Sequence, residues 1–214
     1  KMDLMKLTEF KKPGAAYRLA PFWSWNDNLD SRELVRQIRE MEDKGWGGFF
    51  MHSRVGLVTE YLSKEWMERI KVCAKTAQKV GLHAWLYDED KWPSGFAGGK
   101  VPRRDPSYRS RVLILLDPDE IQENDIPMLE HSIDGDKKVI CKKVFNLDNP
   151  WFNGTCYIDT MNSKAVEYFI ECTHEEYKKE CGEYFGNGIL GIFTDEPCYL
   201  RRSGVTQPIV PWSE

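Results

Sequence analysis

Ile189-Leu-Gly-Ile-Phe-Thr-Asp-Glu-Pro197 is the stretch of this sequence that best indicates its fold. Its apolar, β-branched and aromatic run is typical of a buried parallel strand, and it stops at two adjacent carboxylates, Asp195 and Glu196. In a barrel of alternating strands and helices, catalytic groups lie at the carboxyl ends of the strands. The two acids are therefore candidate site residues. The alternative, that Asp195 caps the turn and Glu196 is solvated beside it, stays open.

The same pattern of an apolar strand followed by polar residues recurs earlier in the chain. Strands are predicted over residues 17–25, 46–51 and 82–87, and a shorter one over 155–158. The residues at their exits, some polar and some aromatic, are Asn26, His52, Arg54, Asp88, Glu89, Asp90, Trp92 and Asp159. Trp23 and Trp25 share one face of the first strand by its period of two, so we expect both to point into a barrel.

Helical periodicity fills the gaps between these strands. Asp30 is the expected N-cap of a first helix that Gly45 ends, and Ser63 caps a second helix that Gly81 ends. A third helix, capped by Asn162 or Ser163, extends to about residue 181. His174 lies on this helix, where we expect a surface role.

Alternating strands and helices predict an α/β fold, and a partial (β/α)8 TIM barrel with about five strands is the first choice. Residues 105–150 show turn signals without helical periodicity and are expected to form a small β-rich insertion, with barrel segments at residues 1–104 and 151–214. Five strands cannot close a barrel of eight, so we expect the remaining strands from the rest of a longer chain. The first strand lacks a G-x-G-x-x-G sequence after it, which disfavours dinucleotide binding.

Composition narrows the possible partners. A net charge of −4 over 214 residues gives no basic footprint for nucleic acid, and no stretch is apolar enough to span a membrane. The six cysteines show neither a zinc spacing nor a C-x-x-C pair, so we expect small core side chains in a reducing compartment. A cytoplasmic location is therefore favoured, while a mature secreted or periplasmic form stays open.

Carboxylates and aromatic residues at one edge of a sheet suit a carbohydrate substrate. The candidate substrate-binding residues are Trp23, Trp25, Asn26, His52, Arg54, Asp88, Trp92 and Asp195. Glycoside hydrolysis uses two carboxyls, one that protonates the leaving oxygen and one that activates water or attacks the sugar. Glu89 and Glu196 are the natural pair because each follows an apolar strand directly after an aspartate. Neighbouring negative charge would raise the pKa of the one that must stay protonated.

The order of these motifs resembles the catalytic barrel of the α-L-rhamnosidases of glycoside hydrolase family 106. The resemblance rests on Pro21-Phe-Trp-Ser-Trp-Asn26, Gly47-Gly-Phe-Phe-Met-His-Ser-Arg54, Tyr87-Asp-Glu-Asp-Lys-Trp-Pro-Ser-Gly95, Asp159 with Asn162, and Gly191-Ile-Phe-Thr-Asp-Glu-Pro197. It implies inverting, calcium-assisted hydrolysis of terminal rhamnosides by two glutamates, which match Glu89 and Glu196. Asp90 and Asp159 are oxygen donors of the hard type that calcium prefers.

Two further interpretations belong to other functional classes. The chain is either a non-catalytic carbohydrate-binding or structural fragment, in which the acids are turn residues, or a metal-dependent sugar isomerase or aldolase-type barrel. The last would need a metal cluster or a Schiff-base lysine, and Lys91 is the only lysine near a strand exit. Its acidic neighbours would hold it charged, which disfavours this interpretation.

Overall fold

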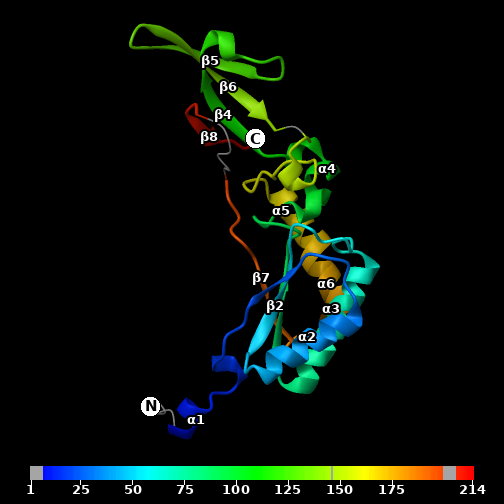
Figure 1. Cartoon of the computed structure of the whole chain (residues 1–214). Helices are drawn as coiled ribbons and strands as arrows, with labels where there is room; N and C mark the ends of the chain where they lie inside the picture. Colours follow the sequence, from blue (N-terminus) through cyan, green and yellow to red (C-terminus); the bar gives the residue numbers. More distant parts are fainter. Residues whose placement is uncertain (1–6, 146, 200–205) are drawn as a thin grey trace. The chain divides into compact units, whose positions relative to one another are not determined.

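The computed structural model describes residues 7–145, 147–199 and 206–214, which belong to two compact units (Figure 1). Unit 1 contains residues up to 91 together with 173–194, and unit 2 contains residues 92–172 and 195–214. Unit 1 holds a parallel sheet with helices, and unit 2 holds an antiparallel sheet. The predicted mixed α/β class is confirmed at this level.

Unit 1 is built on four parallel strands, β1 (Phe22–Trp25), β2 (Gly48–Ser53), β3 (His83–Tyr87) and β7 (Ile189–Phe193), in the order β1-β2-β3-β7. Its main helices are α2 (Ser31–Asp43), α3 (Lys64–Val80) and α6 (Glu176–Cys181), which lie on one side of the sheet in Figure 1. The short helices α1 (Leu7–Lys11), Ala15–Tyr17 and Gly182–Tyr184 complete the unit.

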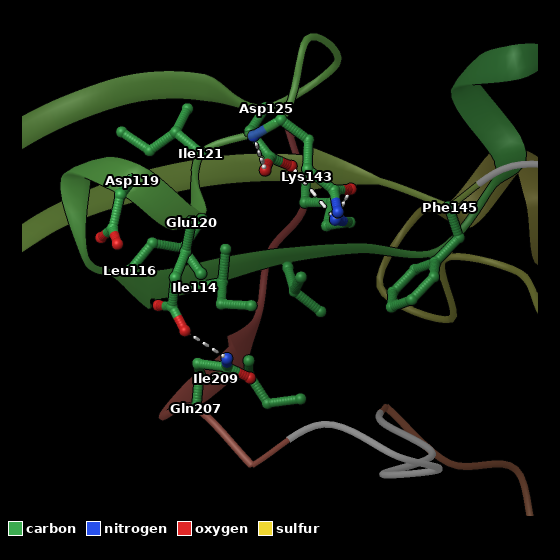
Figure 2. Close-up of a pocket in the computed structure, with 12 residues that line it drawn as sticks. Ile114, Leu116, Asp119, Glu120, Ile121, Asp125, Lys143, Phe145, Gln207 and Ile209 are labelled. Carbon is green, nitrogen blue, oxygen red and sulfur yellow. Dashed lines mark hydrogen bonds and ion pairs between the residues drawn. The ribbon is translucent and has the colours of Figure 1, made fainter.

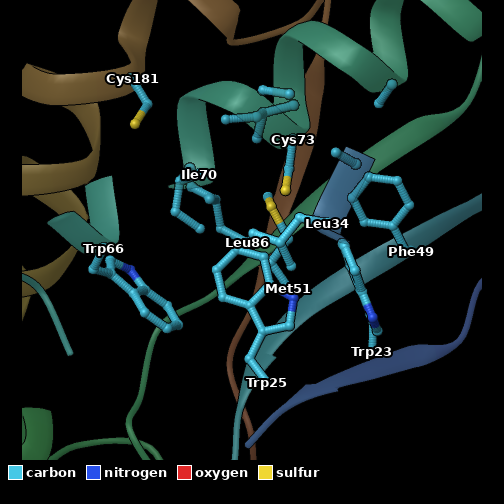
Figure 3. Packing of buried hydrophobic residues seen from close by; sticks show 14 of the residues in the cluster. Trp23, Trp25, Leu34, Phe49, Met51, Trp66, Ile70, Cys73, Leu86 and Cys181 are labelled. Atoms are coloured by element: carbon cyan, nitrogen blue, oxygen red, sulfur yellow. The ribbon is translucent and has the colours of Figure 1, made fainter. Parts of the chain in front are cut away.

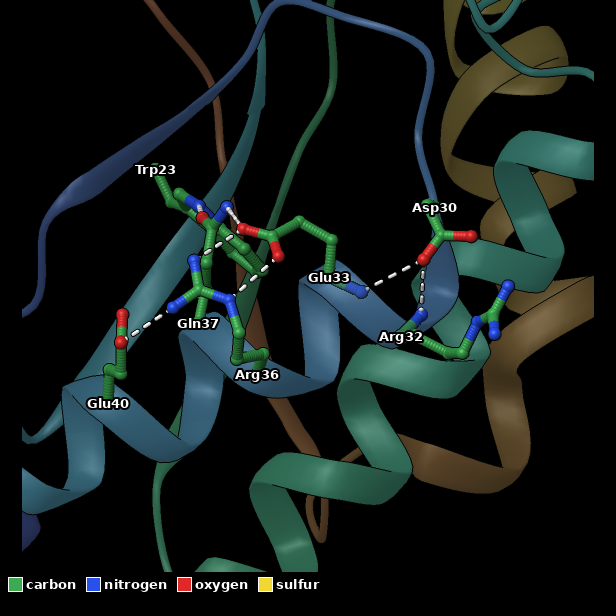
Figure 4. Close-up of polar contacts among 7 residues, drawn as sticks. All are labelled: Trp23, Asp30, Arg32, Glu33, Arg36, Gln37 and Glu40. Atoms are coloured by element: carbon green, nitrogen blue, oxygen red, sulfur yellow. Dashed lines mark hydrogen bonds and ion pairs between the residues drawn. The ribbon is translucent and has the colours of Figure 1, made fainter.

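Helix α2 begins at the predicted cap. The Asp30 side chain accepts hydrogen bonds from two backbone N–H groups of the first turn, at 2.9 and 3.0 Å (Figure 4). On the exposed face Arg36 pairs with Glu33 and holds the pKa of that carboxyl low, at about 2. On the sheet side Gln37 accepts a hydrogen bond of 2.7 Å from Trp23 Nε1, so the helix is tied to β1.

The other predicted helix boundaries are also found. The Ser63 side chain accepts from the backbone N–H of Trp66 at 3.1 Å at the start of α3, and Gly81 ends that helix with φ of 74°. Asn162, one of the two predicted caps, accepts from the N–H of Lys164 at 3.1 Å and opens α5. Short polar side chains at these positions satisfy N–H groups that the first helical turn leaves unpaired.

The core of unit 1 lies between the sheet and its helices, and aromatic rings fill much of it (Figure 3). Trp25 packs edge-on against Trp66 of α3, with ring centroids 5.0 Å apart. Trp66 Nε1 donates to the hydroxyl of Tyr177 at 3.0 Å, and this hydroxyl donates to the carbonyl of Tyr87 at 3.2 Å. One chain of polar contacts therefore joins α3, α6 and the end of β3 inside an apolar core.

Unit 2 holds an antiparallel sheet of β4 (Arg111–Leu116), β5 (Ile126–Ile133), β6 (Asp136–Val144) and β8 (Ile209–Pro211), in the order β5-β6-β4-β8. The first three are the strands predicted for residues 105–150. A second cluster of buried residues packs around α4 (Lys100–Arg104) and α5 (Ser163–Ile170). The remaining short helices of the unit are Ala97–Gly99, Pro106–Tyr108, Pro118–Glu120 and Pro150–Phe152.

Two expectations about local structure were wrong, and one strand was not predicted. Residues 155–158 form two isolated bridges, Asn149 with Thr155 and Arg109 with Ile158, instead of a strand. The strand β2 extends through His52, which the sequence placed in a loop. The C-terminal strand β8 pairs with β4, an addition that the sequence pattern did not predict. The TIM barrel and the three predicted chain segments stay predictions.

The cysteines fit the expected role as small core side chains. Four of the six are buried: Cys73, Cys141, Cys156 and Cys181. Burial raises the pKa of Cys156 and Cys181 to about 11, so these thiols stay protonated near neutral pH. Among the described residues, no helix is both long enough and apolar enough to cross a membrane.

Core packing in unit 1 gives a first testable prediction. Ile70 of α3 is fully buried, whereas Glu68 of the same helix is exposed. The substitution Ile70→Ala should lower the free energy of unfolding by about 2–5 kcal/mol, because it removes buried methyl groups and leaves a cavity. Glu68→Ala is the matched control and should change it by less than about 0.5 kcal/mol. Urea titration followed by tryptophan fluorescence measures both, and equal small effects would contradict the assigned core.

Candidate functional site

Three consecutive carboxylates follow β3 at the carboxyl edge of the parallel sheet. Asp88 and Glu89 are fully buried, and Asp90 is 8% exposed. The buried strand His83–Tyr87 ends directly before them, so the chain carries them to the edge where parallel sheets bind ligands. Carboxylates are seldom buried without partners, because removing charge from water is costly. The contacts of each acid therefore decide what this edge can do.

Asp88 is held from two sides by groups far away in the sequence. Thr194, directly after β7, donates from Oγ1 to Asp88 Oδ2 at 2.6 Å. His174 Nε2 lies 2.9 Å from the same oxygen, and because an ionised carboxylate can only accept, the imidazole N–H is the donor of this hydrogen bond. His174 belongs to a π-helical turn, Glu171–Glu175, and such turns occur frequently at functional sites.

The expected surface role of His174 was wrong. Its side chain is partly exposed, but it pairs with a buried acid 86 positions away. No local sequence signal identifies this contact. Thr194, in contrast, lies inside the Thr-Asp-Glu-Pro motif and could have been included from the sequence.

The other two acids also have partners within unit 1. Ser53, the last residue of β2, donates from Oγ to Asp90 Oδ1 at 2.9 Å. Glu89 Oε1 accepts from the backbone N–H of Asp90 at 2.8 Å. Ser53 could also have been included from the sequence, because it directly follows His52 in one of the quoted motifs. The edge is therefore a connected polar group built from the ends of β2, β3 and β7.

His52 lies beside this group as a neutral ring. It is 4% exposed, its ring centroid is 3.8 Å from that of Tyr87, and its Nδ1 makes no hydrogen bond. Burial, with a smaller effect from the positive charge of Arg54, lowers the pKa of His52 to about 4. His52 is therefore an uncharged imidazole near neutral pH.

The two sheet faces of unit 1 carry different aromatic groups. Trp23 and Trp25 share a face, as predicted, but this face points to the helices, and the expectation that they point into a barrel was wrong. The other face carries Phe22, Phe50, His52, Trp85, Tyr87 and Phe193, whose rings contact one another. Trp23 and Trp25 are only 8% and 2% exposed, which leaves little ring surface for a sugar.

Asn26 and Arg54 lie in the exposed segments that follow β1 and β2. The backbone N–H of Arg54 donates to the carbonyl of Trp25 at 3.0 Å, which continues the pairing of the two strands past their ends. Both side chains are therefore available at the carboxyl edge of the sheet, where the sequence placed them as substrate-binding residues. That role stays a prediction.

Trp92, Asp195 and Glu196 come together in unit 2. Trp92 Nε1 donates to Glu196 Oε2 at 2.5 Å. The backbone N–H of Asp195 donates to Ser94 Oγ at 2.8 Å, and the N–H of Ser94 donates to the Asp195 carbonyl at 2.7 Å. Glu196 is exposed and has φ of +76°, a conformation that costs energy for a residue with a side chain.

The predicted calcium ligands do not form a recognisable site. Asp159 is buried and accepts hydrogen bonds with both oxygens, from the N–H of Met161 at 3.0 Å and from Ser213 Oγ at 2.6 Å. Asp90 accepts from Ser53 in the other unit. Among the described residues, no three His, Cys, Asp or Glu side chains gather as a metal site, whereas calcium takes six to eight oxygens. Calcium therefore stays a prediction, and no chemical step is derived from it.

The predicted site residues thus fall into two groups. Unit 1 contains the carboxylates after β3, with His52, Asn26 and Arg54, and unit 2 contains Trp92, Asp159, Asp195 and Glu196. Glu89 and Glu196 belong to different units, so their pairing stays a prediction.

Burial of His52 predicts a dependence of stability on pH. Between pH 6.5 and about 4 the unfolded chain binds a proton at this histidine and the folded chain does not, so stability falls as the pH falls through this window. His52→Phe keeps a ring at this position and removes the titration. Between pH 7 and pH 4 the free energy of unfolding should fall in both proteins, and the fall should be about 3 kcal/mol smaller in the variant than in the parent. Urea titrations at several pH values measure this difference. The exposed His131 provides the control, His131→Phe, which should lose as much as the parent.

The backbone of Glu196 gives a second prediction. Glu196→Ala and Glu196→Gly both remove the contact with Trp92, but only glycine relieves the positive φ. The glycine variant should therefore be more stable than the alanine variant by about 1 kcal/mol, measured by thermal unfolding. Equal stabilities would mean that the backbone at this position is unstrained.

Comparison with known proteins does not assign this chain to a family. No family model and no curated protein matches the chain. Among solved structures, the chain is similar to a rhamnosidase from Novosphingobium sp. PP1Y, with 18% sequence identity and a TM-score of 0.40. The match covers 59% of this chain and 12% of that protein, so the chain spans a small part of its length. Similarity at this level assigns neither a family nor an activity.

Proposed function

We propose that this chain is part of a glycoside hydrolase, with Glu89 as one of its two catalytic carboxyls. The observation that carries the proposal is the fixed carboxylate group after β3. Asp88 is held by Thr194 and His174, and Asp90 is held by Ser53. Glu89 lies between these two anchored neighbours, fully buried, at the edge of the sheet where active sites form.

The strand order supports a barrel architecture for the proposed enzyme. The sheet order β1-β2-β3-β7 is also the chain order, all its neighbours are parallel, and α2 and α3 connect the first three strands. Adjacent strands of a (β/α)8 barrel have this arrangement. The aromatic face opposite the helices would then be the barrel interior, and further strands would pair with β1 and β7. These strands are proposed to come from a longer polypeptide.

The chemistry proposed for Glu89 is proton transfer at a glycosidic bond. A glycosidase needs one carboxyl to protonate the leaving oxygen and a second, ionised one to activate water or attack the anomeric carbon. Glu89 is proposed to perform one of these roles, and anchoring of Asp88 and Asp90 would keep its backbone in place. Glu196 is proposed as the second carboxyl from the resemblance described above, with inversion and a terminal α-L-rhamnoside as the expected chemistry and substrate.

Substitution of Glu89 tests the proposal. The longer polypeptide proposed above is incubated with a panel of 4-nitrophenyl glycosides that includes the α-L-rhamnoside, and released nitrophenol is measured. Glu89→Gln should lower turnover by about 10²–10⁴-fold, because the amide cannot transfer the proton, while its shape preserves the fold. Glu183→Gln, a change at an exposed glutamate in the last helical turn before β7, should leave turnover unchanged.

The outcomes separate the candidate functions. Loss of turnover in Glu89→Gln with sugar binding retained supports the hydrolase. Sugar binding without turnover in the parent chain, unchanged by Glu89→Gln, would instead support the carbohydrate-binding alternative. If the longer polypeptide neither cleaves any of these glycosides nor binds them, as measured by calorimetry, the proposed function is wrong.

A further inference from the structure

The antiparallel sheet of unit 2 carries a pocket that the proposed hydrolase chemistry does not use (Figure 2). Its volume is about 490 Å³, within the usual range for small-molecule sites. Val112, Ile114 and Leu116 alternate along β4 and therefore project from one face of the sheet. Together with Ile209 of β8 they form an aliphatic floor, and Ile121 and Phe145 complete the apolar lining.

One end of this pocket is polar and contains a buried acid. The Asp125 side chain is 1% exposed, and its Oδ2 accepts from the backbone N–H of Gln122 at 3.0 Å. Its Oδ1 makes no hydrogen bond, although Lys143 Nζ lies 3.3 Å away. Lys143 Nζ also donates to Gln122 Oε1 at 3.2 Å. Figure 2 shows Asp125 and Lys143 side by side at the pocket.

The local turn accounts for only one of the two oxygens of the Asp125 carboxylate, Oδ2. The backbone N–H of Asp125 donates to the Gln122 carbonyl at 3.0 Å, and with the Oδ2 contact this closes the turn before β5. An asparagine would close the same turn without burying a charge. A buried carboxylate oxygen without a hydrogen bond costs free energy that a donor in the pocket would recover. Lys143 compensates the charge of Oδ1 at 3.3 Å, and the oxygen can still accept a hydrogen bond from a ligand in the pocket.

The charges at this end select the chemical group of that ligand. An ammonium group could donate to Asp125 but would be repelled by Lys143, and a carboxylate would pair with Lys143 but be repelled by Asp125. A hydroxyl group is neutral and both donates and accepts, so it fits between the two. The aliphatic floor in turn favours an apolar body attached to this hydroxyl.

We propose that this pocket binds an uncharged, hydroxylated small molecule with an apolar body, whose hydroxyl donates to Asp125 Oδ1 and accepts from Lys143 Nζ. The aliphatic side chains of β4 and β8 contact the body of the ligand. Gln207 and Glu120 also line the pocket, and Gln207 Nε2 donates to Glu120 Oε1 at 3.0 Å. The proposal concerns unit 2 alone and does not depend on the hydrolase proposed above.

Three ligands with one ring and different head groups test this proposal. Cyclohexanol, cyclohexylammonium and cyclohexanecarboxylate are titrated into the full chain labelled at isoleucine δ1-methyl groups, and NMR shifts of Ile114, Ile121 and Ile209 are followed. Cyclohexanol should shift these signals saturably, with at least about tenfold higher affinity than either charged ligand, since tenfold corresponds to about 1.4 kcal/mol. Equal affinities for all three, or no saturable shift, would overturn the proposal without any variant.

Substitutions then test which side chains set the preference. Asp125→Asn leaves Lys143 unopposed and should change the preferred ligand to the carboxylate, whereas Lys143→Gln should change it to the ammonium. Lys138→Gln is the matched control, because Lys138 lies on the same strand, is 28% exposed against 31% for Lys143, and pairs with Asp117 outside the pocket lining. This control should keep the order of the parent. The dispersion of the methyl signals shows whether each variant is folded. If the folded variants still prefer cyclohexanol, Asp125 and Lys143 are not the selecting groups.

Discussion

The carboxyl edge of the parallel sheet depends on how the buried charge of Asp88 is compensated. A charge removed from water requires hydrogen bonds with good geometry, and Asp88 receives them from Thr194 and His174. One partner follows β7 and the other lies on a π-helical turn, so both segments must be docked before β3 can end in buried acids. The nearby chain of contacts from Trp66 through Tyr177 to the Tyr87 carbonyl holds the end of β3 from the apolar side, where it joins that strand to α3 and α6.

Two buried aspartates in this chain have contrasting surroundings. Asp88 accepts from a hydroxyl and an imidazole and lies at the end of a parallel strand. Asp125 lies in a turn, with one oxygen satisfied by the backbone and the other facing a lysine without a hydrogen bond. The first arrangement orients neighbouring groups, as a structural anchor does. The second leaves a hydrogen-bond acceptor beside an apolar surface, and small-molecule pockets usually combine a few polar groups with an apolar lining.

Much of the fold was predictable because the deciding signals are local. The caps Asp30, Ser63 and Asn162 and the terminating Gly81 act within one turn of their helices, and the apolar runs of β3 and β7 stop where their polar residues begin. Alternation along β1 predicted that Trp23 and Trp25 share a face. It could not tell which face the helices cover, because that depends on residues from α2 and α3.

The candidate site was less predictable because its contacts join distant positions. The carboxylates after β3 stand out in the sequence, but the partner His174 is identified only by the fold, and Asp125 looks like an ordinary turn aspartate until its burial is known. Residues 155–158 have the apolar composition of a strand, yet they make single bridges to two different segments. Composition predicted their burial correctly and could not predict the pairing partner.

The π-helical turn that carries His174 also limits how this protein can evolve. A π turn contains one residue more than the α-helical turn it replaces, and each residue rotates a helix by about 100°. Deletion of a single residue within Glu171–Glu175 would restore regular α-helix and remove the widened turn that carries His174, while the helix beyond it, including Tyr177, would keep its direction because the turn absorbs the extra residue. The helix can therefore tolerate substitutions at its exposed positions, whereas a change in its length at this point would separate the buried acid from its imidazole.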